Sequence, residues 1–314
     1  MCIRDRPYDI WAETATTLQL WMQIVGKIRL VQTPWINHAW HVPLYLNGRG
    51  LTTSLISHGG DFLEISFDFI DQQLVIESSR NNHRCQVPLR PCSVAAFYAD
   101  VDAGLRSLGD PIAINTVPCE MSEATPFEQD SRQRNYDGEA ATRFWRTLLQ
   151  VQRVFQEFRA RFIGKCSPIH FFWGSFDLAV TRFSGRVAPE HPGGVPHLSD
   201  WVTREAYSHE VSSAGFWPGG GGFTDPAFYA YAYPTPPGFS AHNVVPAQVF
   251  WHDGLSEFLL PYGDARSARC PDSLILEFLQ STYEAAAVTA EWDRTAWRAQ
   301  KGWQPQMLRQ HRRP

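Results

Sequence analysis

The densest group of side chains that could do chemistry lies in residues 165–186, KCSPIHFFWGSFDLAVTRFSGR. Residues 169–183 within it are rich in aromatic and β-branched types and contain no proline, which predicts one long strand. Because side chains alternate between the two faces of a strand, Trp173, Ser175 and Asp177 should share a face. An indole, a hydroxyl and a carboxylate together could bind a small polar molecule through packing, hydrogen bonds and charge.

Asp177 is the most informative of these residues, because a carboxylate in the middle of an apolar strand must be hydrogen-bonded, ion-paired or solvated. Arg182 and Arg186 follow near the strand end and are the nearest cations in sequence. One hypothesis is a ligand site on the Trp173 face, and the alternative is a buried Asp–Arg pair with a structural role. His170 lies seven residues before Asp177, so a regular strand would separate the two on opposite faces.

Arg182 and Arg186 also flank a Ser-Gly turn, a pattern that suits a bound carboxylate or phosphate as well as solvated turn charges. A second polar stretch, with Tyr207, His209 and Glu210, could complete the site from the following half of the chain. The predicted ligand-binding residues are Trp173, Ser175, Asp177, Arg182, Arg186, Tyr207 and His209. If the protein is an enzyme, the catalytic candidates are Asp177, His209 and Glu210.

Metal chemistry has little support in the sequence. His209 and Glu210 are adjacent, so in a strand they point to opposite faces and cannot chelate one ion. His38, His41 and His209 would form a metal site only if the fold brought them together, and each alone is typical of a hydrogen-bonded structural histidine. The chain lacks the GxSxG, HExxH and complete phosphate-loop motifs, so no cofactor is predicted.

The tyrosines of residues 228–233 give a further surface for ligands. Alternation places Tyr229, Tyr231 and Tyr233 on one face of a predicted strand. Such a face could stack against a sugar or another planar ligand, or pack beneath a loop with the hydroxyl groups at its rim.

Periodicity predicts the elements that position these residues. Helices are expected at residues 8–25, 94–108, 139–163 and 272–291, with Ser93 as an N-cap, residues 28–31 extended, and a long loop over 118–138. Strands are expected at residues 42–46, 51–56, 62–70, 74–78, 112–117, 207–217, 228–233, 248–251 and 257–260. Strands that arrive in hairpins predict mainly antiparallel sheet with packed helices, an α+β fold.

The expected organisation is a single α+β domain over residues 7–298. An alternative is a pseudo-duplication, with two similar halves at about 28–186 and 187–298 that share an order of strands and helix but not residues. The opening MCIRDR resembles translated adapter sequence at the ends of metagenomic reading frames, so residues 1–6 are predicted to be a non-native leader. Residues 299–314 are predicted to be a basic, solvated tail.

Composition excludes several classes of protein. The net charge of −4 without a basic face argues against nucleic acid as a partner. No apolar run approaches the ~20 residues of a membrane span, and no signal peptide is visible. The six cysteines form no zinc-like or redox pair, which predicts reduced thiols in a cytoplasmic protein.

Several long segments distributed over most of the chain carry a family resemblance: NHAWHVPLYLNGRGLTTS, FDFID, SPIHFFWGSFDLAVTRFSGR, EAYSHEVSSAGFWPG, EFLLPY and STYEAAA. Together they resemble an uncharacterised bacterial family, domain-of-unknown-function family 5996. The resemblance implies no activity, cofactor or catalytic residue, so function is argued from the chemistry of the side chains.

Three hypotheses for function follow. The first is a protein that binds or acts on a small polar or anionic molecule in a pocket beside residues 169–183. The second is a non-enzymatic interaction protein with an aromatic docking surface, and the third is a metal-dependent hydrolase that uses His38, His41 and His209. A concave pocket containing Asp177 and His209 would favour the first, and a flat exposed aromatic patch would favour the second.

Overall fold

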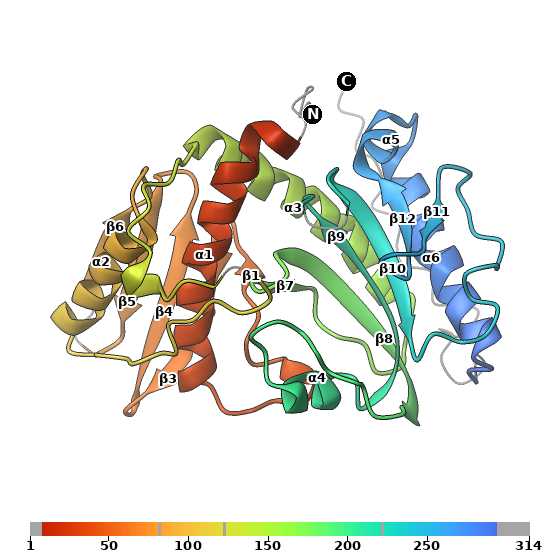
Figure 1. The fold of residues 1–314 in the computed structure, drawn as a ribbon, viewed down its shortest axis with the longest axis horizontal. Coiled ribbons are helices and arrows are strands. Elements are labelled where there is room, and N and C mark those ends of the chain that lie inside the picture. The colour runs from red at the N-terminus through yellow and green to blue at the C-terminus, as the bar shows by residue number, and fades with distance from the viewer. Residues whose placement is uncertain (1–7, 81–82, 122–123, 221–222, 294–314) are drawn as a thin grey trace, which may run out of the picture.

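The structure, a computed structural model, describes residues 8–80, 83–121, 124–220 and 223–293. The predicted leader at 1–6 and the predicted tail at 299–314 lie outside these residues. The described strands form two antiparallel sheets with helices packed against them, which confirms the α+β prediction (Figure 1). Within the described residues, no helix is both long and apolar enough to cross a membrane.

The first sheet has the strand order β1-β2-β4-β5-β6, and β3 pairs with β4 beside β2. Its strands are β1 (Tyr45–Leu46), β2 (Gly50–Thr52), β3 (Ile56–His58), β4 (Asp61–Asp68), β5 (Gln73–Ser78) and β6 (His83–Pro88). Helices α1 (Tyr8–Gln32) and α2 (Val94–Ser107) pack beside it. Ser93 caps α2 as predicted, because its side chain accepts a hydrogen bond from the backbone N–H of Ala96.

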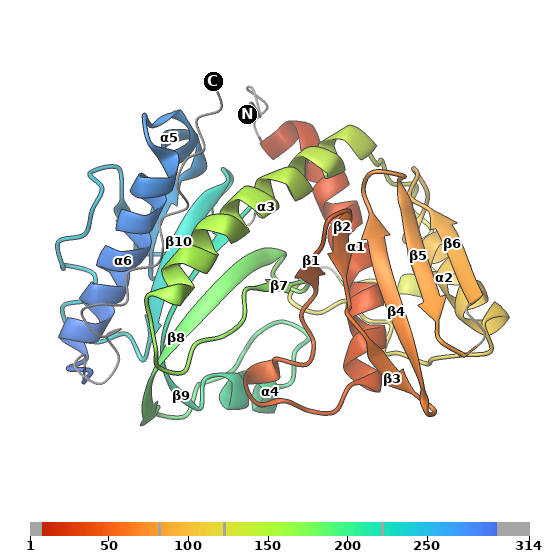
Figure 2. The ribbon, with the colours of Figure 1, turned by 180° about the vertical axis from the view of Figure 1, so that it is seen from behind.

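The second sheet has the strand order β11-β12-β10-β9-β8-β7. Its strands are β7 (His170–Phe172), β8 (Asp177–Val187), β9 (His209–Trp217), β10 (Ala227–Tyr233), β11 (Phe250–His252) and β12 (Glu257–Pro261). Helices α3 (Gly138–Ala160) and α6 (Pro271–Thr289) pack on one of its faces, and α5 (Tyr262–Ser267) follows β12 (Figure 2). A bridge between Leu44 and Phe171 links the β1 end of the first sheet to β7.

Helix α3 confirms the helix predicted over residues 139–163. Phe144, Leu148, Val151, Phe155 and Phe158 are all buried along one stripe. Asp137 caps the helix by accepting a hydrogen bond from the backbone N–H of Ala140 (Asp137 Oδ1). The apolar stripe faces the second sheet and α6, so α3 holds that sheet from one side.

The predicted single strand over residues 169–183 is wrong. The chain instead turns back on itself, so β7 and β8 form an antiparallel hairpin in which His170 faces Ala179 and Phe172 faces Asp177. The turn is tight: Phe176 has a φ of 64°, and its backbone N–H donates to the carbonyl of Phe172 at 2.8 Å. Residues opposite each other in a hairpin share a face, so His170 and Asp177 lie on the same side of the sheet.

Other differences concern short segments. Residues 28–31 are the last turns of α1 and not extended, and residues 112–117 form no strand. The first helix was expected to end at residue 25 but continues to Gln32, so Gly26 lies inside it, where a side chain would collide with the indole of Trp173. The sequence patterns also missed β6, the short helix α4 (Asp200–Ala206), and the 3-10 turns η1 (Asn37–Ala39) and η2 (Phe127–Gln129).

Candidate ligand-binding site

A cavity of about 900 Å³ lies on the face of the second sheet opposite α3 and α6. Side chains of β7, β8, β9, β10 and β12 form its floor. Its walls come from the end of α1, η1 with its neighbours, a segment near residues 115–120, and α4 with its preceding loop. This volume falls within the ~300–1,000 Å³ of cavities that take drug-sized ligands.

Asp177 begins β8 on the cavity floor, and hydroxyl groups donate to both of its carboxylate oxygens. Ser175 Oγ donates to Asp177 Oδ1 at 2.5 Å, and the Tyr229 hydroxyl donates to Asp177 Oδ2. Tyr229 reaches across β9 because Gly215 leaves room there, where a Cβ would collide with the Tyr229 hydroxyl. Burial raises the pKa of Asp177, and the two donors oppose part of that rise.

Glu120 and Glu257 bring two further carboxyl groups to the cavity from distant parts of the chain. Burial raises the pKa of each to about 7, and the negative charge of Asp177 adds to both rises. The Glu120 side chain is exposed, but it is exposed to the cavity and not to the outer surface. The surrounding cavity walls therefore still disfavour the ionised form of its carboxyl group. Among the described residues, neither carboxyl has a hydrogen-bond or ion-pair partner. Three carboxyl groups therefore converge, and two of them are free to meet a ligand.

The backbone around Glu120 is adapted to this position. Glu120 has a φ of 59°, a left-handed conformation that costs free energy in a residue with a side chain, and its N–H donates to the carbonyl of Pro196 at 2.8 Å. Gly174 makes space for the carboxylate, because a Cβ at that position would collide with Glu120 Oε1. The turn between β7 and β8 thus places Ser175 beside Asp177 and leaves room for Glu120.

Positive charge near these carboxyl groups is limited. Lys27 lines the cavity, but its Nζ donates to the carbonyl of Val117 at 2.8 Å, and burial lowers its pKa. Burial lowers the pKa of His170 to about 3, with Arg29 and Arg159 adding to the effect, so this imidazole is neutral near pH 7. Among the described residues that line the cavity, Lys27 is therefore the only lysine or arginine that could face these carboxyl groups.

Aromatic side chains also line the cavity. The aromatic lining residues are Trp35, Trp40, Phe172, Trp173, Phe183, Trp201, Tyr207, Trp217, Tyr229 and Tyr231. Trp35 and Trp201 pack at 4.7 Å between ring centroids and are 42% and 57% exposed, so they form a rim between bulk solvent and the cavity. Trp173 is fixed from behind, because its Nε1 donates to the carbonyl of Val42 at 2.8 Å. The site thus combines flat apolar walls with an acidic floor.

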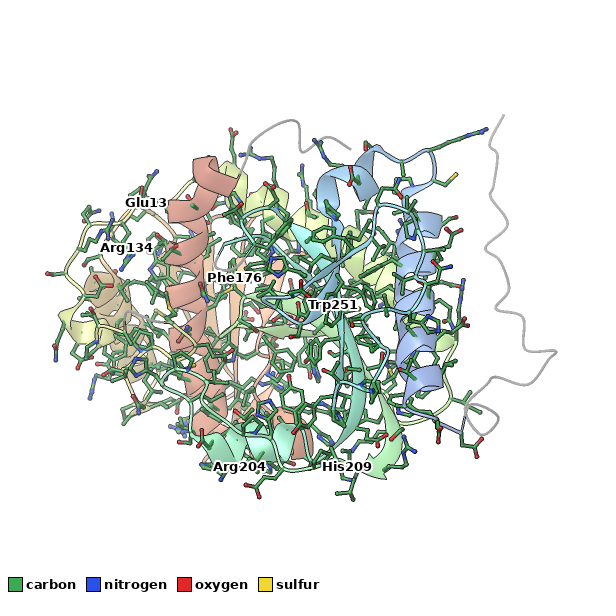
Figure 3. All side chains as sticks on the ribbon, turned by 45° about the vertical axis from the view of Figure 1, so that its right-hand side comes forward. Glu13, Arg134, Phe176, Arg204, His209 and Trp251 are labelled. Atoms are coloured by element: carbon green, nitrogen blue, oxygen red, sulfur yellow. The ribbon has the colours of Figure 1, made fainter. Side chains whose placement is uncertain are left out.

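The structure brings together four of the residues predicted from sequence to bind a ligand. Trp173, Ser175, Asp177 and Tyr207 all line the cavity. Arg182, Arg186, His209 and Glu210 do not line it. In Figure 3, His209 and Arg204 of α4 both lie toward the lower edge of the molecule, and Phe176 lies nearer the middle.

The two arginines serve structural contacts elsewhere. Arg182 is 1% exposed on the opposite face of the sheet, where its guanidinium lies 3.5 Å from the ring centroid of Phe158 and donates to the Phe158 carbonyl at 2.5 Å. Arg186 pairs with Glu210 at 2.7 Å and donates to the Ala290 carbonyl just past the C-terminal end of α6. Neither arginine pairs with Asp177, so the predicted buried Asp–Arg pair is absent from the described structure.

The three candidate metal-binding histidines do not converge on one point. His38 and His41 line the cavity, and the ring of His209 lies 5.7 Å from that of His38. His38 makes two other contacts, from Nδ1 to the Ala206 carbonyl at 2.9 Å and from Nε2 to Lys165 Nζ at 2.5 Å. In the described part of the chain, no three histidine, cysteine, aspartate or glutamate side chains are placed to hold a metal ion.

Glu120 and Glu257 are the site residues that sequence reasoning missed. Glu120 follows Pro118 and Cys119 in a loop without periodicity, so its position depends on tertiary contacts alone. Glu257 stands at the start of a correctly predicted strand, and only the register of β12 against β10 brings it beside the tyrosines. The long predicted loop over 118–138 was a general signal of functional sequence but did not identify Glu120.

Comparison with known families is consistent with the sequence resemblance. The model of a family of unknown function, DUF5996, matches residues 5–299. The chain belongs to this family. No curated protein and no solved structure matches this DUF5996 chain significantly.

Proposed function

We propose that the cavity binds an organic cation, with Glu120, Asp177 and Glu257 supplying the opposite charge. The observation that carries the proposal is the convergence of three carboxyl groups, two without a partner among the described residues, in one aromatic-walled cavity. A ligand cation would neutralise buried negative charge that the protein otherwise holds at a cost. Aromatic faces also attract cations through their quadrupoles.

An anionic ligand, the other part of the expectation from sequence, has weaker support. Its predicted binding groups, Arg182 and Arg186, are engaged outside the cavity lining. The lining cation Lys27 is held by a backbone carbonyl, and burial lowers its pKa. A bound carboxylate or phosphate would also face Glu120, Asp177 and Glu257, whose like charges would repel it.

The aromatic rim bears on the hypothesis of a protein-docking surface. Trp35 and Trp201 are exposed, but they belong to the lining of the cavity and not to a flat patch. This concave setting favours a small molecule over a partner chain as the occupant. The metal-dependent hydrolase hypothesis receives no support from the arrangement of His38, His41 and His209.

We further propose a bacterial source, which the family resemblance implies, and a cytoplasmic setting, which the cysteine content suggested. The support is that the cysteines in the described residues are all free thiols, namely Cys85, Cys92, Cys119, Cys166 and Cys270. Burial raises the pKa of the Cys119 thiol to about 11, which keeps it protonated and unreactive at neutral pH.

The experiment is isothermal titration with benzylamine, benzyl alcohol and benzoate, which share a ring and differ in charge. Benzylamine should bind more tightly than benzyl alcohol, and benzoate should bind weakest. Glu120→Gln and Asp177→Asn should each weaken benzylamine binding by about tenfold, the typical effect of one lost charged partner. The control Glu139→Gln removes the same charge from a 90% exposed side chain outside the cavity lining and should leave binding unchanged. Equal binding of the amine and the alcohol would overturn the proposal.

A further inference from the structure

Four hydroxyl groups form a continuous row on the floor of the same cavity. The Tyr207 and Tyr231 hydroxyl oxygens lie 2.7 Å apart, Tyr231 hydrogen-bonds to Ser213, and Ser213 Oγ lies 2.8 Å from Thr181 Oγ1. Strand register produces most of the row, because Tyr231 pairs with Ser213 across β10 and β9, and Ser213 pairs with Thr181 across β9 and β8. All four residues line the cavity.

The row retains hydrogen-bonding capacity for a ligand. Each hydroxyl supplies one donor and two acceptor lone pairs, so four hydroxyls joined by three hydrogen bonds keep one proton and several lone pairs. Tyr207, Tyr231 and Thr181 are half-buried and keep surface toward the cavity, while Ser213 is buried. Hydroxyl protons can rotate, so the row can present a donor or an acceptor as the ligand requires.

The row lies beside the carboxyl groups. The charge of Glu257 contributes to the raised pKa of Tyr207, Tyr229 and Tyr231, for each of which burial is the largest cause. Tyr229, which donates to Asp177, stacks on Tyr231 with ring centroids 6.1 Å apart. A ligand whose ammonium meets the carboxyl groups would therefore place neighbouring atoms against the hydroxyl row.

This juxtaposition narrows the class of ligand. A purely aromatic or aliphatic amine would cover the row and leave its remaining donor without an acceptor, which costs free energy in a buried site. A molecule with hydroxyl groups next to its amine could satisfy both the row and the carboxyl groups. Its apolar ring face could pack on the flat walls, for example on Trp217.

We propose that the ligand is a polyhydroxylated amine, the chemical class of amino sugars, with its ammonium at Glu120, Asp177 and Glu257 and its hydroxyl groups at the row formed by Thr181, Ser213, Tyr231 and Tyr207. This inference rests on the proposed function, because the ammonium is the cation of that proposal. It adds that recognition of hydroxyl groups, and not charge alone, determines specificity.

The test is titration of the full chain with glucosamine, glucose and cyclohexylamine. Glucosamine carries both features, glucose replaces the ammonium by a hydroxyl, and cyclohexylamine keeps the ammonium on a ring without hydroxyls. Glucosamine should bind about tenfold more tightly than cyclohexylamine. Tyr231→Phe and Ser213→Ala should each reduce that advantage to about threefold or less, by weakening the binding of glucosamine and without weakening the binding of cyclohexylamine. Tyr98→Phe, on α2 outside the cavity lining, is the matched control and should retain the full advantage.

Each outcome separates this inference from the proposed function. If cyclohexylamine binds as tightly as glucosamine, and Glu120→Gln weakens both, the ligand is an organic cation but the inference about its hydroxyl groups is wrong. The inference is also wrong if the advantage of glucosamine survives both hydroxyl-removing variants with their circular dichroism unchanged. If glucose binds as tightly as glucosamine and Glu120→Gln has no effect, both proposals fail.

Discussion

The ionisation of Glu120 and Glu257 makes cation binding dependent on pH, and the direction can be stated in advance. Each carboxyl has a pKa raised to about 7, so in the free protein it is roughly 10% ionised at pH 6 and 90% ionised at pH 8. A bound ammonium requires the ionised form. Affinity for benzylamine, which stays protonated over this range, should therefore rise by about tenfold from pH 6 to pH 8 for each carboxyl engaged.

Isothermal titration at pH 6, 7 and 8 measures this dependence. Titration in two buffers with different heats of ionisation also counts the protons released on binding. At pH 6 the protein should release protons, because the ammonium lowers the pKa of the carboxyl groups it meets. In Glu120→Gln, the affinity for benzylamine should depend less on pH, because only the ionisation of Glu257 still contributes to that dependence. A flat affinity from pH 6 to 8 with no proton release would refute the role of both carboxyl groups.

Three further predictions concern stability and are measured by denaturant or thermal unfolding. Gly26→Ala should destabilise the fold by about 1–3 kcal/mol despite the better helix propensity of alanine, because its Cβ would displace Trp173; an increase in stability would show that Trp173 can move freely. Phe155→Ala should lower the free energy of unfolding by ~3–5 kcal/mol, because Phe155 is fully buried. Gln156→Ala, at the exposed neighbouring position, should change it by no more than about 0.5 kcal/mol. Similar losses in both variants would contradict the assignment of the buried face of α3. The pKa of His170 is lowered from 6.5 to about 3, so its contribution to stability is fully present above pH 6.5, and the free energy of unfolding should fall by about 1.4 kcal/mol per pH unit as the pH drops from 6.5 toward 3. His170→Phe should remove this dependence of stability on pH, and an unchanged dependence would exclude His170 as its source.

Patterns that reflect local physics predicted most of the fold. The stripe from Phe144 to Phe158 and the cap at Ser93 identified α3 and α2, since both signals depend on residues within one helix. The hairpin of β4 and β5 was likewise predicted from two adjacent apolar runs. The antiparallel character of the sheets followed from the predominance of such hairpins.

The hairpin of β7 and β8 could not be predicted in the same way. Its turn places Phe176, a bulky residue, at a φ of 64°, a conformation that sequence rules assign to glycine, asparagine or aspartate. Packing compensates this cost, because the Phe176 ring is buried against Phe144 and Phe171. The error reversed the predicted side of His170 while leaving Asp177 correctly identified as the unusual residue of the segment.

The candidate site was only partly predictable for a related reason. Trp173, Ser175 and Asp177 are close in sequence, so a single segment was enough to suggest them. Glu120 and Glu257 reach the cavity through a loop contact and a strand register that involve residues far away in the chain. The two arginines were singled out because of their charge, but Arg182 is buried against α3, and Arg186 binds Glu210 and the carbonyl of Ala290 just past α6.

Binding of an organic cation in the cavity is tested most simply by identifying the compounds that the protein retains from a cell extract. Purified protein would be incubated with bacterial metabolites, washed, denatured and assayed for released compounds by mass spectrometry, beside the variant in which Glu120→Gln, Asp177→Asn and Glu257→Gln are combined. Compounds that the natural protein retains and the variant loses should carry a positive charge at neutral pH. Retention of anionic or uncharged compounds, or of the same compounds by both proteins, would contradict the proposal of cation binding.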